Sequence, residues 1–214
     1  MNTLSLLTFF PAILGLLLLF LPDRAGRTAK VLAFTGALLL FGFGLMRLWG
    51  LRGAPVLVPE KFIWFTVAGL PVQYHLALDG LNYWLVLLTL FLVPLTMAAT
   101  WNSLKEGEGR FNALFLILQT GMLGALLAQD LLFFYLFWEA MLIPMYFMIG
   151  VWGGDDRRYA ANKFFLFTLS GSLLWLVALL YIAGKAGSFT PALMASAATQ
   201  LPFGTQSSLF LAFA

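Results

Sequence analysis

Six long apolar runs dominate this sequence, and they decide what the chain can fold into. The runs cover residues 4–21, 31–49, 80–100, 111–129, 131–150 and 164–184. A bilayer core about 30 Å thick needs about 20 helical residues, because each residue of a helix rises about 1.5 Å. Unbroken runs of this length do not fit the alternating pattern of membrane β-strands. We therefore predict an all-α fold, a polytopic transmembrane helix bundle with six complete spans.

Charged residues are too few to cover a water-soluble surface. They make up 10% of the chain, against about 25% in soluble domains. The sequence has no cysteine and one histidine, His75, so it lacks the ligands of a thiolate zinc site, an iron–sulfur cluster or a bis-histidine haem. The net charge of +3 comes from basic residues scattered among apolar runs, which make no nucleic-acid-binding face. We expect a lipid bilayer around this chain, and no cofactor or metal in it.

Basic residues are distributed unequally between the two sides of the predicted bundle. The connections after the first, third and fifth runs carry three, two and three lysines or arginines, eight of the twelve in the chain. Because cytoplasmic loops are enriched in Lys and Arg, the N-terminus is predicted to face away from the cytoplasm. No basic residue precedes the first run, which is the reverse of a secretory signal peptide, so this run is predicted to remain as a helix.

The long connection between the second and third runs has predicted structure of its own. Residues 61–67 and 72–78 are rich in aromatic and β-branched residues, and they flank residues 68–71, Ala-Gly-Leu-Pro. This pattern predicts a short β-hairpin lying on the outer surface. Asp79 follows the hairpin directly and is predicted to cap the third helix.

Three further features mark helix starts. Asp130 precedes the fifth run and is predicted to be its N-cap. Thr190 followed by Pro191 is typical of the first residues of a short interfacial helix. Residues 208–214 begin another apolar run. We expect it to be the start of a seventh span that continues beyond Ala214, since seven helical residues cannot cross a bilayer.

One acidic residue, Glu139, lies inside an apolar run, whereas the other acids lie at run ends or in connections. It follows Leu131 by about 12 Å of helix, too deep for its short side chain to reach the headgroups. Insertion scales place a carboxylate near the helix centre at about 2.5–3.5 kcal/mol unfavourable, and such residues mark functional sites by default. Glu139 is therefore the candidate residue for proton translocation.

Pro144 is predicted to shape the surroundings of Glu139. Proline has no N–H, so the carbonyl of Ala140 loses its helical partner, and we expect a kink with room for water there. Polar residues at mid-span are candidates to extend a path for protons: Gln119, Thr120, Thr168, Ser170 and Ser172. Two roles stay open for Glu139. It is either a group that exchanges protons or a protonated structural group with a permanent hydrogen bond.

The segment that carries Glu139 resembles a known family. Residues 131–150, LLFFYLFWEAMLIPMYFMIG, resemble the fifth transmembrane helix of the antiporter-like subunits of respiratory complex I, within the subunit M or mitochondrial subunit 4 family. The resemblance continues in residues 74–81, 162–165 and 210–214, so it spans most of the chain.

This resemblance implies a proton-translocating membrane-arm subunit of a NADH:quinone oxidoreductase, with no redox chemistry in this chain. It implies quinone reduction elsewhere in the complex, other membrane-arm subunits as partners and a bacterial inner (plasma) membrane. The family's fifth-helix glutamate, matched here by Glu139, is thought to interact with a lysine of a broken seventh helix. Complete subunits have about fourteen helices, including two inverted five-helix repeats. Residues 1–214 would then be a single membrane domain, the N-terminal part of such a subunit, with the lysine beyond Ala214.

Two other functions fit the same residues. A subunit of a multisubunit sodium/proton antiporter or of a membrane-bound hydrogenase would share these helices and the glutamate. A structural membrane subunit would use Glu139 only as an inert polar contact. Lys163, near the start of the sixth run, is predicted to be an interfacial anchor and is not assigned the role of the family's lysine.

Overall fold

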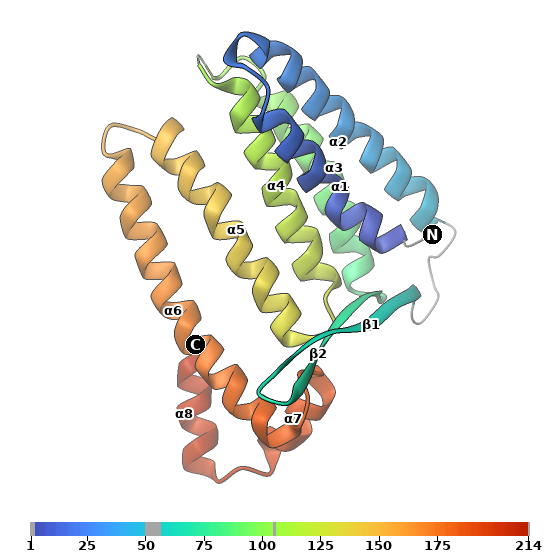
Figure 1. The fold of residues 1–214 in the computed structure, drawn as a ribbon, viewed down its shortest axis with the longest axis vertical. Coiled ribbons are helices and arrows are strands. Elements are labelled where there is room, and N and C mark those ends of the chain that lie inside the picture. Colours follow the sequence, from blue (N-terminus) through green and yellow to red (C-terminus); the bar gives the residue numbers. More distant parts are fainter. Residues whose placement is uncertain (1–2, 50–56, 105, 214) are drawn as a thin grey trace.

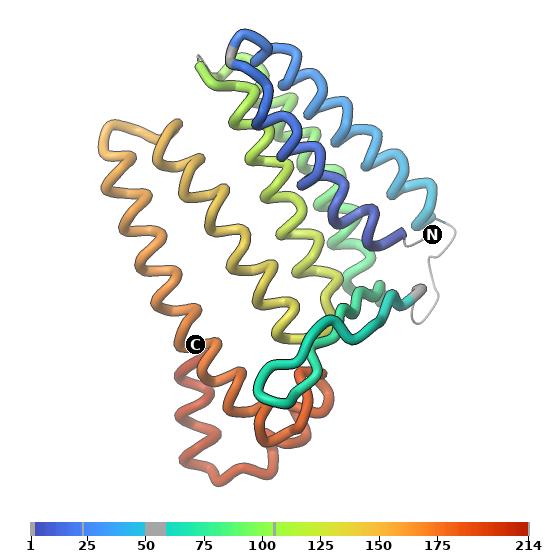
Figure 2. The backbone as a smooth tube through the Cα atoms, in the orientation of Figure 1, coloured from blue at the N-terminus to red at the C-terminus, as the bar shows by residue number. Residues whose placement is uncertain are grey.

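Helices that alternate in direction make up most of the molecule (Figure 1). The structure is a computed structural model, and it describes residues 3–49, 57–104 and 106–213. The elements are α1 (Thr3–Leu19), η1 (Asp23–Ala25), α2 (Gly26–Trp49), β1 (Leu57–Val67), β2 (Leu70–Leu78), α3 (Asn82–Ala99), α4 (Glu108–Leu127), α5 (Leu131–Trp152), α6 (Arg157–Ala186), α7 (Pro191–Thr199) and α8 (Phe203–Phe213). Figure 2 traces how the chain passes up and down the bundle and places α7 and the hairpin together at one end.

The predicted helical membrane architecture is confirmed in its coarse form. Five described helices, α2 to α6, are long and apolar enough to cross a bilayer, and α1 is an apolar helix of 17 residues. The count of six complete spans and a seventh beginning remains a prediction.

Several helices begin earlier than the apolar runs predicted. The second begins at Gly26 rather than at residue 31, and the sixth begins at Arg157 rather than at residue 164. Their first turns carry arginine, which is a good helix former and whose long side chain reaches water from a helix end. The last helix begins at Phe203 rather than at residue 208, because a polar first turn does not prevent helix formation.

The central helix of the group is α4, which packs against α1, α2, α3 and α5. Glycines allow these close approaches. A Cβ added at Gly15 of α1 would lie 2.6 Å from the carbonyl oxygen of Ala113 on α4, and one added at Gly124 would lie 2.2 Å from the ring of Phe137 on α5. Small residues of this kind let helix backbones approach closely in membranes.

The two faces of α5 contact different neighbours. Phe133 and Phe137 belong to the apolar cluster that α5 shares with α1, α3 and α4. Leu132 and Tyr135 belong to a second cluster, which includes Leu179 and other residues of α6. Thus α5 lies between α4 and α6, in agreement with the row of helices in Figure 1.

The predicted hairpin is present, with a shorter turn than expected. Its two antiparallel strands are joined by Ala68 and Gly69, which have φ angles of 50° and 80°. Two positive φ values in a two-residue loop are typical of a type I′ turn, whose twist matches that of the strands. Residues 70 and 71 were predicted in the turn, but β2 begins at Leu70 and Pro71 pairs with Thr66.

Carboxylates attach the hairpin end to the helices. Glu60 of β1 accepts hydrogen bonds from the backbone N–H groups of Leu4 (2.9 Å) and Ser5 (3.0 Å), and also from the Ser5 hydroxyl. These N–H groups belong to the first turn of α1, where the helix itself provides no partners for them. Glu60 therefore caps a helix that lies 55 residues away in sequence.

The predicted cap Asp130 is confirmed, whereas the N-cap residue of α3 is Leu81 and Asp79 supports the turn just before that helix. Asp79 accepts hydrogen bonds from the N–H groups of Leu81 and Asn82, and the Asn82 side chain accepts one from the N–H of Asp79. Asp130 accepts from the N–H groups of Leu132 and Phe133 at the start of α5. Its second oxygen accepts from the N–H of Gln73 on β2 at 3.0 Å.

The short helix predicted after the sixth run is also confirmed. Thr190 is the N-cap residue of α7, and Pro191 is its first helical residue. Ser188 supports this start, because its hydroxyl oxygen accepts from the N–H of Thr190 at 3.1 Å.

Candidate functional site

Glu139 lies inside α5, eight residues after the first residue of that helix. The residue is half-buried, and its Oε1 atom is buried without a hydrogen-bond partner among the described residues. An unpaired buried carboxyl oxygen is costly. Such a group is unusual in a stable core, where the great majority of buried polar atoms are paired.

The direction of Glu139 follows from its neighbours on the same face of α5. Residues three, four or seven apart share a helix face, and Tyr135 and Tyr146 lie four and seven residues from Glu139. The Tyr135 ring stacks on Trp175 of α6 with 5.7 Å between centroids. The Tyr146 hydroxyl donates a hydrogen bond to Asn162 of α6 at 2.9 Å. Glu139 therefore lies on the face of α5 that is turned toward α6.

A cavity adjoins this face one helical turn from Glu139. It has a volume of about 510 Å³ and lies between α5, α6 and α8. Its polar lining comes from Tyr135, Thr168 and Ser172. The Tyr135 hydroxyl lies within electrostatic range of both Ser172 and Glu139. Three side chains with hydroxyl groups thus line the cavity, and one of them, Tyr135, interacts with Glu139.

The polar residues predicted at mid-span do not form one continuous group. Gln119 and Thr120 are buried on α4, and their side chains, like Glu139, have buried polar atoms without partners in the described part of the chain. Gln119 lies between Leu116 and Leu123, which pack with residues of α3. Neither Gln119 nor Thr120 is among the residues that line the cavity beside α6, because α5 lies between α4 and α6.

The other members of the predicted group divide in the same way. Thr168 and Ser172 lie on the cavity next to Glu139. Ser170 is exposed, and its hydroxyl donates to the carbonyl of Phe167 in its own helix at 2.9 Å. The structure thus keeps two of the five mid-span candidates on the side of Glu139, namely Thr168 and Ser172.

Pro144 is buried within α5, which remains helical from Leu131 through Trp152. The expected free carbonyl at Ala140 follows from the missing N–H of proline. Water beside this carbonyl remains a prediction.

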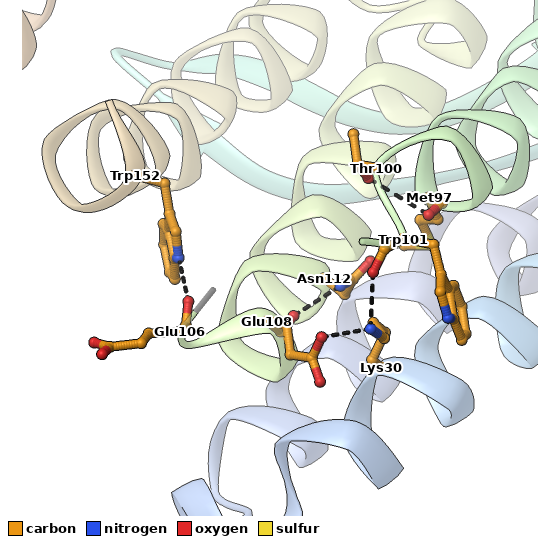
Figure 3. A network of polar contacts seen from close by, with 8 residues as sticks. All are labelled: Lys30, Met97, Thr100, Trp101, Glu106, Glu108, Asn112 and Trp152. Atoms are coloured by element: carbon orange, nitrogen blue, oxygen red, sulfur yellow. Dashed lines mark hydrogen bonds and ion pairs between the residues drawn. The ribbon is translucent and has the colours of Figure 1, made fainter. Parts of the chain in front are cut away.

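A second polar network, which the sequence did not reveal, joins α2 and α4 at the opposite end from the hairpin (Figure 3). Lys30 of α2 forms an ion pair with Glu108, the first residue of α4. Its ammonium group also donates to the carbonyl of Trp101 at 2.9 Å and lies 4.6 Å from the centre of the Trp101 ring. The Lys30 side chain is 9% exposed, so most of its charge is compensated by these partners.

Sequence patterns did not identify this pair because its two members are 78 residues apart. In the sequence, Lys30 is one of three basic residues in the connection after the first run, where it bears only on the predicted orientation. Lys163, predicted to be an interfacial anchor, lies in the second turn of α6 with its ammonium group 5.5 Å from the centre of the Tyr159 ring.

Titratable groups of the hairpin have shifted pKa values. Burial lowers the pKa of His75, the charge of Lys61 lowers it further, and Asp130 opposes the shift. Burial raises the pKa of Tyr74, the hydrogen bond with Ser5 opposes this, and Glu60 adds to it. Within the described ranges, no three His, Asp or Glu side chains are grouped as metal ligands.

These observations define a class of protein, a multi-pass helical membrane protein with a half-buried acid inside a span. Residues 57–129 match the model of the NADH-ubiquinone oxidoreductase chain 4 amino terminus, and residues 128–214 match the transmembrane model of NADH:quinone oxidoreductases and Mrp antiporters. The chain belongs to the family of antiporter-like complex I subunits that includes subunit M and chain 4.

Individual relatives agree with this assignment. NADH-quinone oxidoreductase subunit M of Rhodobacter capsulatus is 37% identical over 227 residues, which cover 99% of this chain and 44% of the relative. A chain of respiratory complex I from Thermus thermophilus superimposes with a TM-score of 0.81 at 31% identity, covering 98% of this chain and 42% of that chain. This chain therefore spans less than half the length of these relatives.

The fold is more widely shared than the sequence. A chain of the Mrp complex from a Dietzia species superimposes with a TM-score of 0.78 at 20% identity, covering 98% of this chain and 22% of that chain. At this identity the likeness concerns the fold alone.

Proposed function

We propose that this chain is the N-terminal part of a proton-translocating membrane-arm subunit of a NADH:quinone oxidoreductase, with Glu139 as its proton-exchanging residue. The observation that carries the proposal is the buried, unpartnered Oε1 atom of Glu139 within a membrane-spanning helix. A structural acid would be expected to have its oxygens paired. A group that must gain and lose a proton needs room for a changing partner.

The surroundings of Glu139 support this assignment. Tyr135, Thr168 and Ser172 line the cavity, and Tyr135 interacts with both Ser172 and Glu139. Hydroxyl groups both donate and accept hydrogen bonds, so they suit either protonation state of the acid. A lysine of a seventh helix beyond Ala214 would provide the positive charge that favours the carboxylate.

The wider arrangement follows from the family and from the charges of the chain. In this proposal residues 1–214 form a single membrane domain with six spans and the beginning of a seventh, in a bacterial plasma membrane. The N-terminus and the hairpin face away from the cytoplasm, because eight of the twelve basic residues lie in connections on the other side. The partners are other membrane-arm subunits, and redox cofactors belong to other chains.

Glu139→Gln in the intact complex tests the proposal. We expect electron transfer from NADH to quinone to continue in uncoupled vesicles, while protons pumped per electron fall at least about tenfold, since glutamine does not titrate. Glu139→Asp should retain part of the pumping. Glu106→Gln is the matched control, because Glu106 is exposed in the turn before α4. Unchanged pumping in Glu139→Gln at full electron flux would establish the structural role instead.

The transmembrane model that matches residues 128–214 includes Mrp antiporters as well as NADH:quinone oxidoreductases, and it favours one alternative, a subunit of a sodium/proton antiporter. Affinity purification of the complete protein from its own membranes separates the two. Flavin and iron–sulfur subunits that oxidise NADH should be recovered with it. Recovery with antiporter subunits alone, together with sodium-dependent proton exchange in vesicles, would establish the antiporter.

A further inference from the structure

A large cavity lies at the end of the bundle opposite the hairpin. It has a volume of about 1300 Å³ and is lined by residues of α1, η1, α2, α4, α5 and α6. Its size exceeds the range of about 300–1,000 Å³ that is typical of small-molecule sites. The ribbons of α4 and α5 diverge toward this end in Figure 1, whereas Gly124 of α4 is in close contact with Phe137 of α5 nearer the hairpin.

Positive charge prevails around this cavity. Four arginines line it: Arg24, Arg27, Arg110 and Arg157. Two glutamates, Glu106 and Glu108, also line it, but the charge of Glu108 is already met by its ion pair with Lys30. Arginine is suited to phosphate because its planar guanidinium can donate two parallel hydrogen bonds.

Three helix N-termini add to this positive potential. Gly26, Glu108 and Arg157 are the first residues of α2, α4 and α6, and all three line the cavity. The N–H groups of a first helical turn have no partners within the helix, and the helix dipole is positive at that end. Helix N-termini are accordingly common sites of phosphate binding.

The remaining wall of the cavity is apolar and belongs to membrane-spanning helices. Leu18 and Leu19 come from the last turns of α1, and Leu114 comes from α4. Phe147 and Val151 come from the second half of α5. A small water-soluble anion would use the arginines but leave this wall in contact with water, at a cost of about 25 cal/mol per Å².

We propose that this cavity binds an anionic phospholipid. The phosphate group lies among Arg24, Arg27 and Arg157 beside the helix N-termini, and an acyl chain lies along the wall formed by α1 and α5. Basic pockets between membrane helices on the cytoplasmic side recognise such headgroups. The lipid would fill the space between α4 and α5 at the end where these helices diverge, and so it would stabilise their arrangement.

Tryptophan fluorescence provides a direct test, because Trp152 lines the cavity. The complete protein is reconstituted in phosphatidylcholine nanodiscs that contain a small fraction of brominated phosphatidylglycerol or brominated phosphatidylcholine. The emission of Trp152 is the difference between the spectra of the unchanged protein and of Trp152→Phe. We expect brominated phosphatidylglycerol to quench this emission at fractions about tenfold lower than brominated phosphatidylcholine requires. Native mass spectrometry of the purified protein should show retained phosphatidylglycerol or cardiolipin.

Substitution of the arginines links the signal to the site. The triple variant Arg24→Gln/Arg27→Gln/Arg157→Gln should lose the tenfold preference and the retained lipid. Arg158→Gln, the matched control, should keep both, since Arg158 neighbours Arg157 but is not among the residues that line the cavity.

Two results would overturn the proposal. Equal quenching by the two brominated lipids in the unchanged protein would show that the cavity does not select an anionic headgroup. Complete loss of the quenching by brominated phosphatidylglycerol on addition of millimolar inorganic phosphate would identify a site for a soluble anion. Neither result depends on proton pumping, so the lipid proposal can fail while the role of Glu139 stands.

Discussion

The buried acids at the hairpin end and the half-buried acid in the middle of α5 differ in their hydrogen bonding. Glu60 and Asp130 are 9% and 2% exposed, and both accept several hydrogen bonds from backbone N–H groups of helix starts. Glu139 keeps a buried oxygen without a partner among the described residues. The difference separates acids that hold the fold together from an acid that, in the proposed function, exchanges a proton.

The largest stability effect should come from Asp130. Replacement by alanine leaves the N–H groups of Leu132, Phe133 and Gln73 without their acceptor. A lost N-cap costs about 0.5–2 kcal/mol, and a buried unsatisfied N–H costs about 1–3 kcal/mol. We expect the free energy of unfolding in mixed micelles to fall by about 2–4 kcal/mol. Asp130→Asn keeps one acceptor oxygen and should lose less; equal stability of Asp130→Ala and the unchanged protein would contradict the comparison.

Glu60→Ala should have the next largest effect. It removes the acceptor for the first turn of α1 and the link between α1 and the hairpin, at about 1–3 kcal/mol. Hydrogen exchange should rise at the amides of Leu4 and Ser5 before it rises in α4. Glu60→Gln is the control, since its amide oxygen can still accept; exchange that rises uniformly through the protein would argue against a local cap.

Glu139→Gln should change stability little. Because Oε1 has no partner in the described structure to lose, and a glutamine side chain can still hydrogen-bond with the Tyr135 hydroxyl, the free energy of unfolding should stay within about 0.5 kcal/mol of the unchanged value. The same micelle titration measures this. A loss comparable to that of Asp130→Ala would place Glu139 with the structural acids and would weaken the proposed role in proton exchange.

The smallest effect concerns pH and His75. Burial lowers the pKa of this half-buried residue in the folded state, so the unfolded chain binds the proton more readily. The stability from the neutral imidazole is present above about pH 6.5, the ordinary value, and is lost as pH falls through the folded pKa. The melting temperature of His75→Gln should therefore fall less between pH 7.5 and pH 5 than that of the unchanged protein. Parallel melting curves for the two proteins over this range would show that His75 does not contribute.

The sequence predicted the features that are local in the chain. Asp130 and Thr190 are N-cap residues as expected, because a cap depends on residues within one turn. The hairpin also followed from neighbouring residues. The apolar runs underestimated the lengths of α2 and α6. Helix ends outside the membrane interior tolerate lysine and arginine, whereas the membrane interior does not.

The features that the sequence did not reveal depend on contacts between distant segments. The partners of Glu60 and Lys30 lie 56 and 78 residues away, and no spacing rule connects residues so far apart. The depth of Glu139 in the membrane could be predicted from its position within one helix. The division of the polar residues between the two sides of α5 could not, because it depends on how α4 and α6 pack against α5. Topology determines which polar groups can meet.

The length of α6 indicates where the membrane lies on this molecule. Its 30 residues would extend about 45 Å, more than the hydrocarbon layer of about 30 Å. Lys163 and Lys185, each placed over the ring of a tyrosine four residues earlier, are separated by about 33 Å of helix. We expect these two lysine–tyrosine pairs to lie at the headgroup levels of the two leaflets. The first turns of α6 would then lie outside the hydrocarbon layer at one surface, and α7 would lie outside it at the other.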